Sequence, residues 1–223
     1  SKEQLFIFDT TLRDGAQTQG VDFSVDDKMK IASALDNLGV DYIEGGWPGA
    51  NPTDTEFFQK KYHFKNAKLT SFGMTKKTGR SADNDPGLSA ITNSNTSSVC
   101  LVGKSWDFHV EVALGISNEE NLENISESAK LFIREQKEFM FDAEHFFDGY
   151  KANPKYAISC LKAAFDEGAR WIILCDTNGG TLPHEVTKIV TEVSKIIPGK
   201  NLGIHAHNDT GNAVANSLSA VLA

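Results

Sequence analysis

Several features are scarce in this sequence, and each scarcity excludes a class of protein. The chain has three cysteines, Cys100, Cys160 and Cys175, and no Cys-x-x-Cys pair. Because their number is odd and their positions lie far apart, we expect reduced thiols rather than a disulfide framework or a structural zinc site. No apolar run approaches the ~18 residues of a membrane span, and no basic segment followed by an apolar core opens the chain. We therefore expect a cytoplasmic protein with no membrane partner.

Positive charge is also in short supply. The chain has 22 lysines and arginines against 30 aspartates and glutamates, which gives a formal net charge of -8. A surface of this sign repels phosphates, so we expect no nucleic-acid partner. One basic cluster remains at Lys76, Lys77 and Arg80. It could meet the phosphates of an anionic ligand, although a solvated loop explains it more simply.

What the sequence does contain is a repeated unit. Each unit has a short apolar run rich in β-branched or aromatic residues, then a polar stretch, then an amphipathic segment bounded by glycine or proline. With 223 residues, 40% of them hydrophobic, the chain can form one sizeable core. The apolar runs predict strands over residues 5–9, 40–46, 68–73, 98–103, 138–144, 171–176 and 202–207.

Helix signals separate these strands. Ser24 with Asp27 fits a capping box at the start of one helix, and Ser117 with Glu120 fits a second. Apolar residues then recur at helical spacing, which predicts one-sided helices that cover a sheet. Apolar strands that alternate with such helices predict parallel strands buried on both faces, in either an open doubly wound sheet or a (β/α)8 barrel.

The positions of the polar residues favour the barrel. They follow nearly every predicted strand, and barrel enzymes build their sites from the carboxyl ends of many strands. An open sheet usually places a glycine-rich phosphate loop at one switch point, and no G-x-G-x-x-G follows the first strand. We therefore predict an α/β fold of the (β/α)8 TIM-barrel type. The polar strand-end residues are Arg13, Asp14, Glu44, Asp142, Glu144, Asp176, Thr177, Asn178, His205 and His207.

The predicted barrel is incomplete. A full (β/α)8 barrel takes about 250 residues, and only seven strands precede the apolar segment 212–223, which begins a seventh helix. We expect residues 1–223 to form one catalytic domain with about seven βα units, truncated before the eighth strand. Such a barrel has two unpaired strand edges.

One pair of histidines suggests a metal site. His205 and His207 lie two residues apart on a predicted strand, so their side chains point to the same face. Asp14 follows the first strand, which lies two places from the seventh around an eight-stranded circle. Two imidazoles and one carboxylate with open positions suit a divalent transition metal or Mg²⁺. A hydrogen-bonded histidine pair without a metal is the alternative.

Three motifs together carry a family resemblance. They are "DTTLRDG" at residues 9–15, "CDTNGG" at 175–180 and "HAHND" at 205–209. They resemble the metal-dependent, pyruvate carboxyltransferase-like barrels, the family of 2-isopropylmalate, homocitrate and citramalate synthases and hydroxymethylglutaryl-CoA lyase. The segments "YIEGGWPGANPTD" and "DAEHFFDGYKANP" are most similar to the citramalate synthase branch. The isopropylmalate branch usually has glutamate where Ala16 stands and a "VGFP"-like segment where "GGWP" stands.

The resemblance implies a Claisen-type acyltransferase that condenses acetyl-CoA with the α-keto acid pyruvate to give citramalate, on a route to isoleucine. Asp14, His205 and His207 would hold a divalent metal, Mn²⁺, Mg²⁺ or Zn²⁺, that polarises the keto group. Arg13 would neutralise the developing alkoxide, and Glu144 would help to generate the acetyl-CoA enolate. For Arg13 and Glu144, a structural ion pair is the alternative.

The resemblance also implies roles around this centre. Thr177 would bind the substrate carboxylate, and Gln17 and Glu44 would complete a hydrogen-bond cage around Arg13. Trp47 would wall the pocket against long keto-acid side chains. The alternative for Thr177 is a helix cap, and the alternative for Gln17 and Glu44 is a polar residue outside the site. The alternative for Trp47 is a tryptophan that packs in the core. The family further implies a homodimer in which a segment after the barrel contributes to acetyl-CoA binding.

Other functions stay open on the sequence alone. One alternative is a 2-isopropylmalate or homocitrate synthase, or a lyase that cleaves a related hydroxyacyl thioester. From a different class, a non-catalytic metal-binding or keto-acid-binding barrel remnant is the second alternative.

Overall fold

The computed structural model describes residues 4–223 and consists of parallel strands alternating with helices. Each strand pairs with the next one along the chain, in the order β1 to β7, and every pairing is parallel. The strands are β1 Phe8–Asp9, β2 Tyr42–Gly46, β3 Lys68–Met74, β4 Ser98–Lys104, β5 Glu138–Glu144, β6 Trp171–Asp176 and β7 Leu202–Ala206. The seven predicted strands are thereby confirmed.

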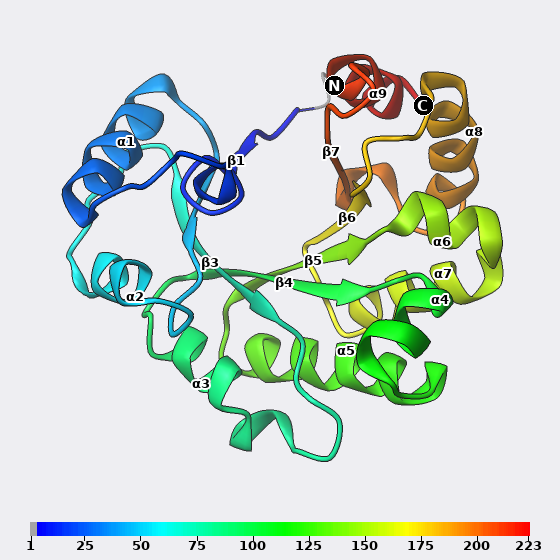
Figure 1. Ribbon diagram of the computed structural model, residues 1–223, viewed down its shortest axis with the longest axis horizontal. Helices are drawn as coiled ribbons and strands as arrows, with labels where there is room; N and C mark the ends of the chain where they lie inside the picture. Colours follow the sequence, from blue (N-terminus) through cyan, green and yellow to red (C-terminus); the bar gives the residue numbers. More distant parts are fainter. Residues whose placement is uncertain (1–3) are drawn as a thin grey trace.

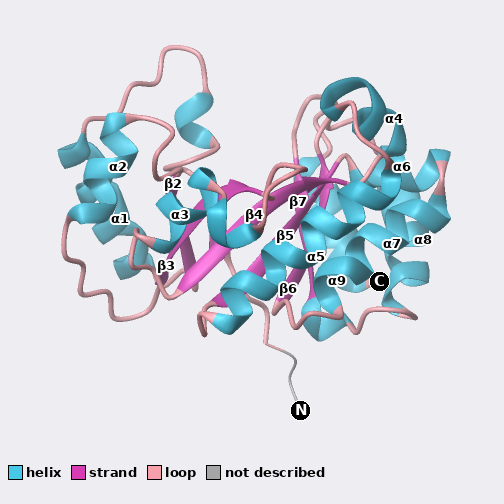
Figure 2. Cartoon of the chain, turned by 90° about the horizontal axis from the view of Figure 1, so that it is seen from below, coloured by secondary structure: helices cyan, strands magenta, loops and turns pink. Residues whose placement is uncertain are grey.

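The sheet curls into an open barrel. Figure 1 shows the strands along an arc with the helices outside it, and Figure 2 shows the strands running side by side between the helices. Within residues 4–223, β1 and β7 do not pair with each other. The prediction of an incomplete (β/α)8 barrel is therefore confirmed. We call the gap between β1 and β7 the open seam.

The first strand is shorter than predicted. The prediction covered residues 5–9, whereas β1 spans Phe8–Asp9 and pairs with β2 alone. A strand at the open seam has a ladder partner on one side only, so fewer of its residues are held in strand geometry.

The helices follow the strands in the predicted alternation, and none of those in the described range is long and apolar enough to cross a membrane. They are α1 Val25–Leu38, α2 Pro52–Gln59, α3 Pro86–Thr92, α4 Asp107–His109, α5 Asn118–Arg134, α6 Phe146–Ala152, α7 Pro154–Phe165, α8 Pro183–Ser194 and α9 Ala213–Leu222. Short 3-10 turns lie at Gly15–Gln17, Ala82–Asn84 and Gly199–Asn201, and a π-helical turn lies at Val110–Leu114.

The capping predictions are confirmed. The Ser24 hydroxyl accepts from the backbone N–H of Asp27 at 3.1 Å, and the Asp27 carboxylate accepts from the Ser24 N–H at 3.0 Å. Ser117 and Glu120 make the same reciprocal pair at the start of α5. Each cap satisfies N–H groups that have no partner inside the helix and is worth about 1 kcal/mol.

The two faces of the curled sheet have different partners. Side chains on the outer face, such as Leu101, Phe139 and Phe141, pack under the helices in the largest hydrophobic cluster. Because side chains alternate along a strand, the intervening residues line the barrel interior. On β5 these are Met140 near the base, then Asp142, then Glu144 at the carboxyl end. The interior thus changes from apolar to polar towards the mouth.

Aromatic and charged residues close the base of the interior. The Tyr42 hydroxyl bonds the Glu138 carboxylate and accepts from the Trp171 indole N–H at 3.1 Å. The Arg170 guanidinium lies 3.7 Å from the centre of the Trp171 ring. The polar end of the barrel is therefore the end through which a ligand can enter.

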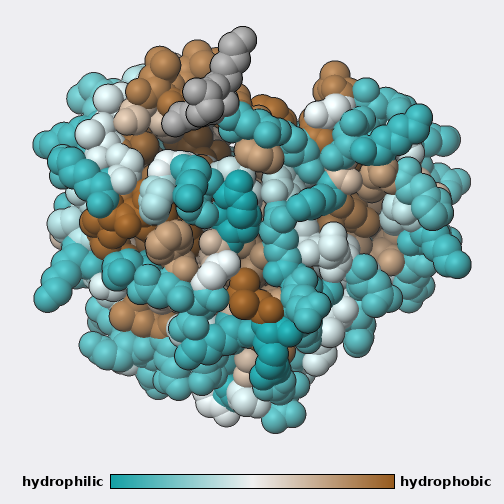
Figure 3. All heavy atoms as spheres, turned by 180° about the vertical axis from the view of Figure 1, so that it is seen from behind, coloured by the Kyte–Doolittle hydropathy of each residue, from teal (hydrophilic) through white to brown (hydrophobic). Residues whose placement is uncertain are grey.

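The last helix exposes an apolar face. Figure 3 shows hydrophobic surface at the upper left, where α9 lies. Val214, Leu218 and Leu222 on this helix are 74%, 59% and 86% exposed. The apolar surface of the molecule thus includes the helix that follows β7, next to the open seam.

Candidate active site

The three predicted metal ligands meet at the barrel mouth. Asp14 lies in a tight turn after β1, in which three successive N–H groups, those of residues 13–15, donate to the Thr10 carbonyl at 2.9–3.2 Å. Its Oδ2 lies 3.2 Å from Nε2 of His205 and 3.6 Å from Nε2 of His207. The two imidazole rings are nearly parallel, with centres 5.0 Å apart. One carboxylate oxygen thus faces both histidine nitrogens across the open seam.

Asp14 and His205 shift each other's pKa in opposite directions. The hydrogen bond with His205 lowers the pKa of Asp14 to about 2. Burial opposes the charged form of His205, but the hydrogen bond to Asp14 and the charge of Asp142 raise its pKa above the ordinary value. The Asp14 charge thus favours the protonated form of His205. A metal ion would take the place of the proton, because a ligating histidine must be neutral.

The donor set fits a divalent metal. Two imidazoles and one carboxylate offer ligand atoms that all lie within 4.8 Å of one another. Their residues come from two ends of the chain and converge on one point, which leaves the remaining coordination positions for a ligand.

Arg13 is held rigidly beside this triad. Its Nε donates to the fully buried Glu44 carboxylate on β2, and its guanidinium lies 4.0 Å from the centre of the Phe72 ring. Its Nη1 also lies 3.4 Å from Oδ1 of Asp14. Burial lowers the pKa of Arg13, but the Glu44 carboxylate raises it above the ordinary value overall, so the guanidinium keeps its charge.

Two buried carboxyl groups lie beneath the triad. Burial raises the pKa of Glu44 to about 7 against the opposing charge of Arg13, and burial likewise raises the pKa of Asp142. Oε2 of Glu44 and Oδ1 of Asp142 have no hydrogen-bond partner in the described part of the chain. These oxygens give the interior below the mouth a polar floor that can accept hydrogen bonds.

Glu144 lies at the mouth end of β5, and its partner is a residue that the sequence analysis missed. Its Oε2 lies 2.5 Å from Nζ of Lys104, the last residue of β4. The two side chains are 26% and 17% exposed, so the pair borders the interior. A signal existed in the sequence, because Lys104 is a polar residue at the end of a predicted strand, as the other site residues are.

Thr177, directly after β6, is fixed by a neighbouring loop. Its hydroxyl oxygen accepts from the backbone N–H of His145 at 2.8 Å, so the hydroxyl hydrogen stays available to a ligand. The loop is held by Asp148, whose Oδ2 lies 3.1 Å from Nδ1 of His145 and accepts from the Asn178 amide at 3.0 Å. His145 has a φ of 54°, which places its N–H towards Thr177 in a left-handed turn.

Trp47 lies on the same side of the mouth as Arg13. Its ring makes an edge contact with Phe72, with centres 5.4 Å apart, and Phe72 in turn lies under Arg13. Its backbone N–H donates to Asp54 at 2.8 Å, and Asp54 pairs with the buried Lys28 at 2.5 Å. Lys28 and Asp54 are further supporting residues that the sequence analysis missed.

Gln17 is placed differently from its predicted companion. Glu44 bonds Arg13 as expected, whereas Gln17 is exposed and makes no side-chain hydrogen bond to Arg13 or to any other described residue. Gln17 ends the 3-10 turn of residues 15–17, in which no residue is buried. A contact with substrate stays a prediction for Gln17.

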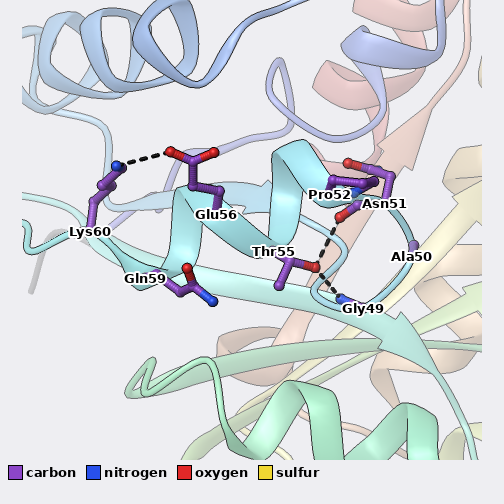
Figure 4. Close-up of a pocket in the computed structure, with 8 residues that line it drawn as sticks. All are labelled: Gly49, Ala50, Asn51, Pro52, Thr55, Glu56, Gln59 and Lys60. Atoms are coloured by element: carbon purple, nitrogen blue, oxygen red, sulfur yellow. Dashed lines mark hydrogen bonds and ion pairs between the residues drawn. The ribbon is translucent and has the colours of Figure 1, made fainter.

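Figure 4 shows a hollow in the surface beside the β2–α2 loop. Thr55 fixes this loop, because its Oγ1 accepts from the Gly49 N–H at 3.0 Å and donates to the Asn51 carbonyl at 2.9 Å. The lining contains none of the predicted site residues, so the hollow is separate from the barrel mouth.

In the basic cluster of Lys76, Lys77 and Arg80, one of the three charged groups is already paired within the protein. Lys76 is buried, and its Nζ donates to the Arg80 carbonyl at 2.8 Å and pairs with Glu127 at 3.4 Å. Lys77 and Arg80 are exposed. Lys76 therefore departs from the expected solvated loop, because its ammonium is already paired inside the protein, and a contact of Lys77 or Arg80 with phosphate stays a prediction.

The chain is similar in sequence to known proteins over nearly its whole length. The chain is 54% identical to (R)-citramalate synthase from Aquifex aeolicus, over 99% of this chain and 42% of that protein. It is 33% identical to 2-isopropylmalate synthase 1 from Caldanaerobacter subterraneus, over 98% of this chain and 54% of that protein. The chain thus spans about half the length, or less, of these curated relatives.

A solved structure supports the barrel fold. Hydroxymethylglutaryl-CoA lyase from Pseudomonas aeruginosa superposes with a TM-score of 0.81 at 19% identity, over 98% of this chain and 73% of that chain. Residues 4–223 match the HMGL-like family. With this match over nearly its whole length, the chain belongs to the HMGL-like family.

Proposed function

We propose that the chain is the catalytic barrel of a divalent-metal-dependent acyltransferase that condenses acetyl-CoA with pyruvate to give citramalate and free CoA. The observation that carries the proposal is the convergence of Asp14, His205 and His207 next to a buried Arg13–Glu44 pair. The choice of pyruvate is supported by the higher identity to a citramalate synthase, 54%, than to a 2-isopropylmalate synthase, 33%.

Asp14, His205 and His207 would hold Mn²⁺, Mg²⁺ or Zn²⁺, and the bound ion would supply Lewis-acid polarisation of the keto group. Arg13 then stabilises the negative charge that develops on the keto oxygen. Its contacts with Glu44 and Phe72 hold the guanidinium in place before the reaction, so little reorganisation is needed when the charge appears.

Glu144 is the proposed base. Its carboxylate accepts a proton from the methyl carbon of the acetyl thioester, and the C–H electron pair becomes the enolate. The enolate carbon attacks the keto carbon of pyruvate, which forms the C–C bond and moves the C=O π electrons onto oxygen. This alkoxide then takes up one proton, equal to the one that Glu144 removed, and becomes the hydroxyl of the citramalyl thioester. Water then cleaves the C–S bond of the citramalyl thioester, which gives the carboxylic acid and the CoA thiol.

Thr177 and Trp47 are the proposed substrate contacts. The Thr177 hydroxyl donates to the keto-acid carboxylate, because its oxygen is already held by the His145 N–H. Trp47 and Phe72 narrow the mouth on the Arg13 side. Each misfitting methylene costs about 1–3 kcal/mol, so this wall favours the methyl group of pyruvate over a branched side chain.

The domain organisation, compartment and oligomeric state are also part of the proposed function. We propose that residues 1–223 act as a single catalytic domain in a cytoplasmic homodimer. Light scattering of the full-length gene product tests the dimer, and a monomeric mass would contradict it.

Free-thiol release by the full-length gene product tests the function. We expect acetyl-CoA to yield thiol fastest with pyruvate and to give citramalate as the product. Fastest release with 2-oxoisovalerate or 2-oxoglutarate would assign an isopropylmalate or homocitrate synthase instead. No release with any keto acid would leave a lyase or a non-catalytic binding protein, and cleavage of a hydroxyacyl thioester would distinguish these two.

A matched pair of variants controls the assay. Asp14→Asn removes the shared carboxylate and is expected to lower thiol release at least about 100-fold. Asp166→Asn makes the same chemical change in an exposed residue that pairs with Lys162 on α7, and should leave the rate unchanged. Equal rates for the two variants would contradict the proposed metal site.

A further inference from the structure

The Lys104–Glu144 pair is built into two adjacent strands. Lys104 and Glu144 are register partners at the last step of the β4–β5 ladder, and Nζ lies 2.5 Å from Oε2. The pair is largely withdrawn from solvent, unlike the exposed ion pairs that contribute little to a structure.

The backbone on both sides of this pair is fastened. The Asn121 amide donates to the Lys104 carbonyl at 2.9 Å and to the Tyr156 hydroxyl, also at 2.9 Å. Ser105 donates to the Glu144 carbonyl from its hydroxyl at 2.7 Å and from its N–H at 3.3 Å. Neither side chain therefore starts from a mobile loop.

The two oxygens of Glu144 differ in their surroundings. Oε2 is bound by Lys104, whereas no hydrogen bond to Oε1 occurs within the described range. Other ionisable groups lie near the pair, but none of them hydrogen-bonds this carboxylate among residues 4–223. These groups are His109, Asp142, His145, Asp148 and Cys175.

We propose that Lys104 is a positioning residue for Glu144: by binding Oε2, its ammonium directs Oε1 at the methyl carbon of the acetyl thioester. This inference rests on the proposed function. In the proton-transfer step, Oε1 gains the proton, the C–H bond breaks and its electron pair stays on carbon as the enolate. Lys104 keeps all of its protons throughout, so its contribution is to orientation.

Steady-state kinetics of the full-length gene product test this role. Lys104→Met is expected to lower kcat about 10- to 100-fold, because a misplaced base loses much of the 10²–10⁴-fold that positioned proton transfer supplies. The KM for pyruvate should stay within about twofold, because Lys104 makes no hydrogen bond or ion pair with the Asp14 triad or Thr177. Lys104→Arg keeps a cation at this place and should recover at least about half of the lost activity on a logarithmic scale.

A double-mutant comparison separates positioning from a general structural effect. Once Glu144→Gln has removed the base, adding Lys104→Met should lower kcat no further than about twofold. Lys162→Met is the control, because Lys162 on α7 is half-exposed and pairs with Asp166, the residue that follows this helix. It should match the wild type. Thermal melting shows whether Lys104→Met is folded.

Each outcome decides the inference. Losses that multiply in the double variant, or no rescue by arginine, would overturn the positioning role. A raised KM for acetyl-CoA with unchanged kcat would overturn it in favour of phosphate binding by Lys104. These results require an active wild type, so they leave the proposed function standing. Thiol release by no form of the protein would overturn both proposals.

Discussion

At the scale of single residues, the site depends on how firmly each charge is held. Arg13 illustrates this, since it bonds Glu44, lies over Phe72 and approaches Asp14. A planar guanidinium can bond a carboxylate through its edge while its flat face stacks on an aromatic ring, a geometry that the compact lysine ammonium does not reproduce.

Arg13→Lys therefore tests whether geometry or charge alone matters. We expect kcat for thiol release to fall about 100-fold or more, because the charge is kept but its position near the keto oxygen is lost. Arg134→Lys is the matched control, because Arg134 is 63% exposed and pairs with the exposed Asp83. An Arg13→Lys enzyme with wild-type kcat would show that Arg13 is a structural residue.

At the scale of elements, the sequence predicted strands and helices well because their signals are local. The capping boxes at Ser24 and Ser117 and the apolar periodicity require only neighbouring residues, and the structure confirms them. The hydrogen bonds of Asp36 could not be predicted from neighbouring residues. It lies in α1, but its carboxylate accepts from the N–H groups of Lys65, Asn66 and Ala67, which lead into β3.

This link gives a stability prediction with a defined pH dependence. Burial raises the pKa of Asp36, but the three backbone hydrogen bonds outweigh it and hold the pKa below its ordinary value of 3.8. An acid with a lowered folded pKa stabilises the protein above that ordinary value, and the stabilisation is lost as the pH falls through the folded pKa.

Asp36→Asn should accordingly reduce the free energy of unfolding by about 2 kcal/mol at pH 7, since it removes hydrogen bonds to a charged group. The difference from wild type should shrink as the pH falls below the ordinary pKa of 3.8. Urea unfolding at several pH values measures this, with the exposed Asp166→Asn as the control. A difference that stays constant down to pH 2 would show that the carboxylate charge is irrelevant.

At the scale of the whole molecule, the metal site joins the two ends of the curled sheet. Asp14 follows β1, while His205 and His207 belong to β7 and the residue after it, and these strands share no ladder in residues 4–223. A cation bound there would bridge the open seam. Ligands that bind only the folded state stabilise it by about 2.7 kcal/mol at 100 times Kd.

Metal removal is therefore expected to lower thermal stability. Adding Mn²⁺ to the EDTA-treated full-length protein at 100 times Kd should raise Tm by about 5–10 °C. Asp14→Asn should abolish most of this shift, and Asp166→Asn should retain it. An equal shift in both variants would place the binding site elsewhere.

The spacing of neighbouring residues is enough to predict the alternation of strands and helices, the helix caps, and the motifs that contain Arg13, Asp14 and the histidine pair. These features are encoded by short-range spacing, because side-chain direction repeats with the period of each element. Three features follow from the folded chain alone: Lys104 pairs with Glu144, Lys76 is buried, and Gln17 is exposed without a hydrogen bond to Arg13. The physical reason is that these contacts depend on strand register and on the curl of the sheet. Both arise from the packing of residues far apart in the chain, which no local pattern records.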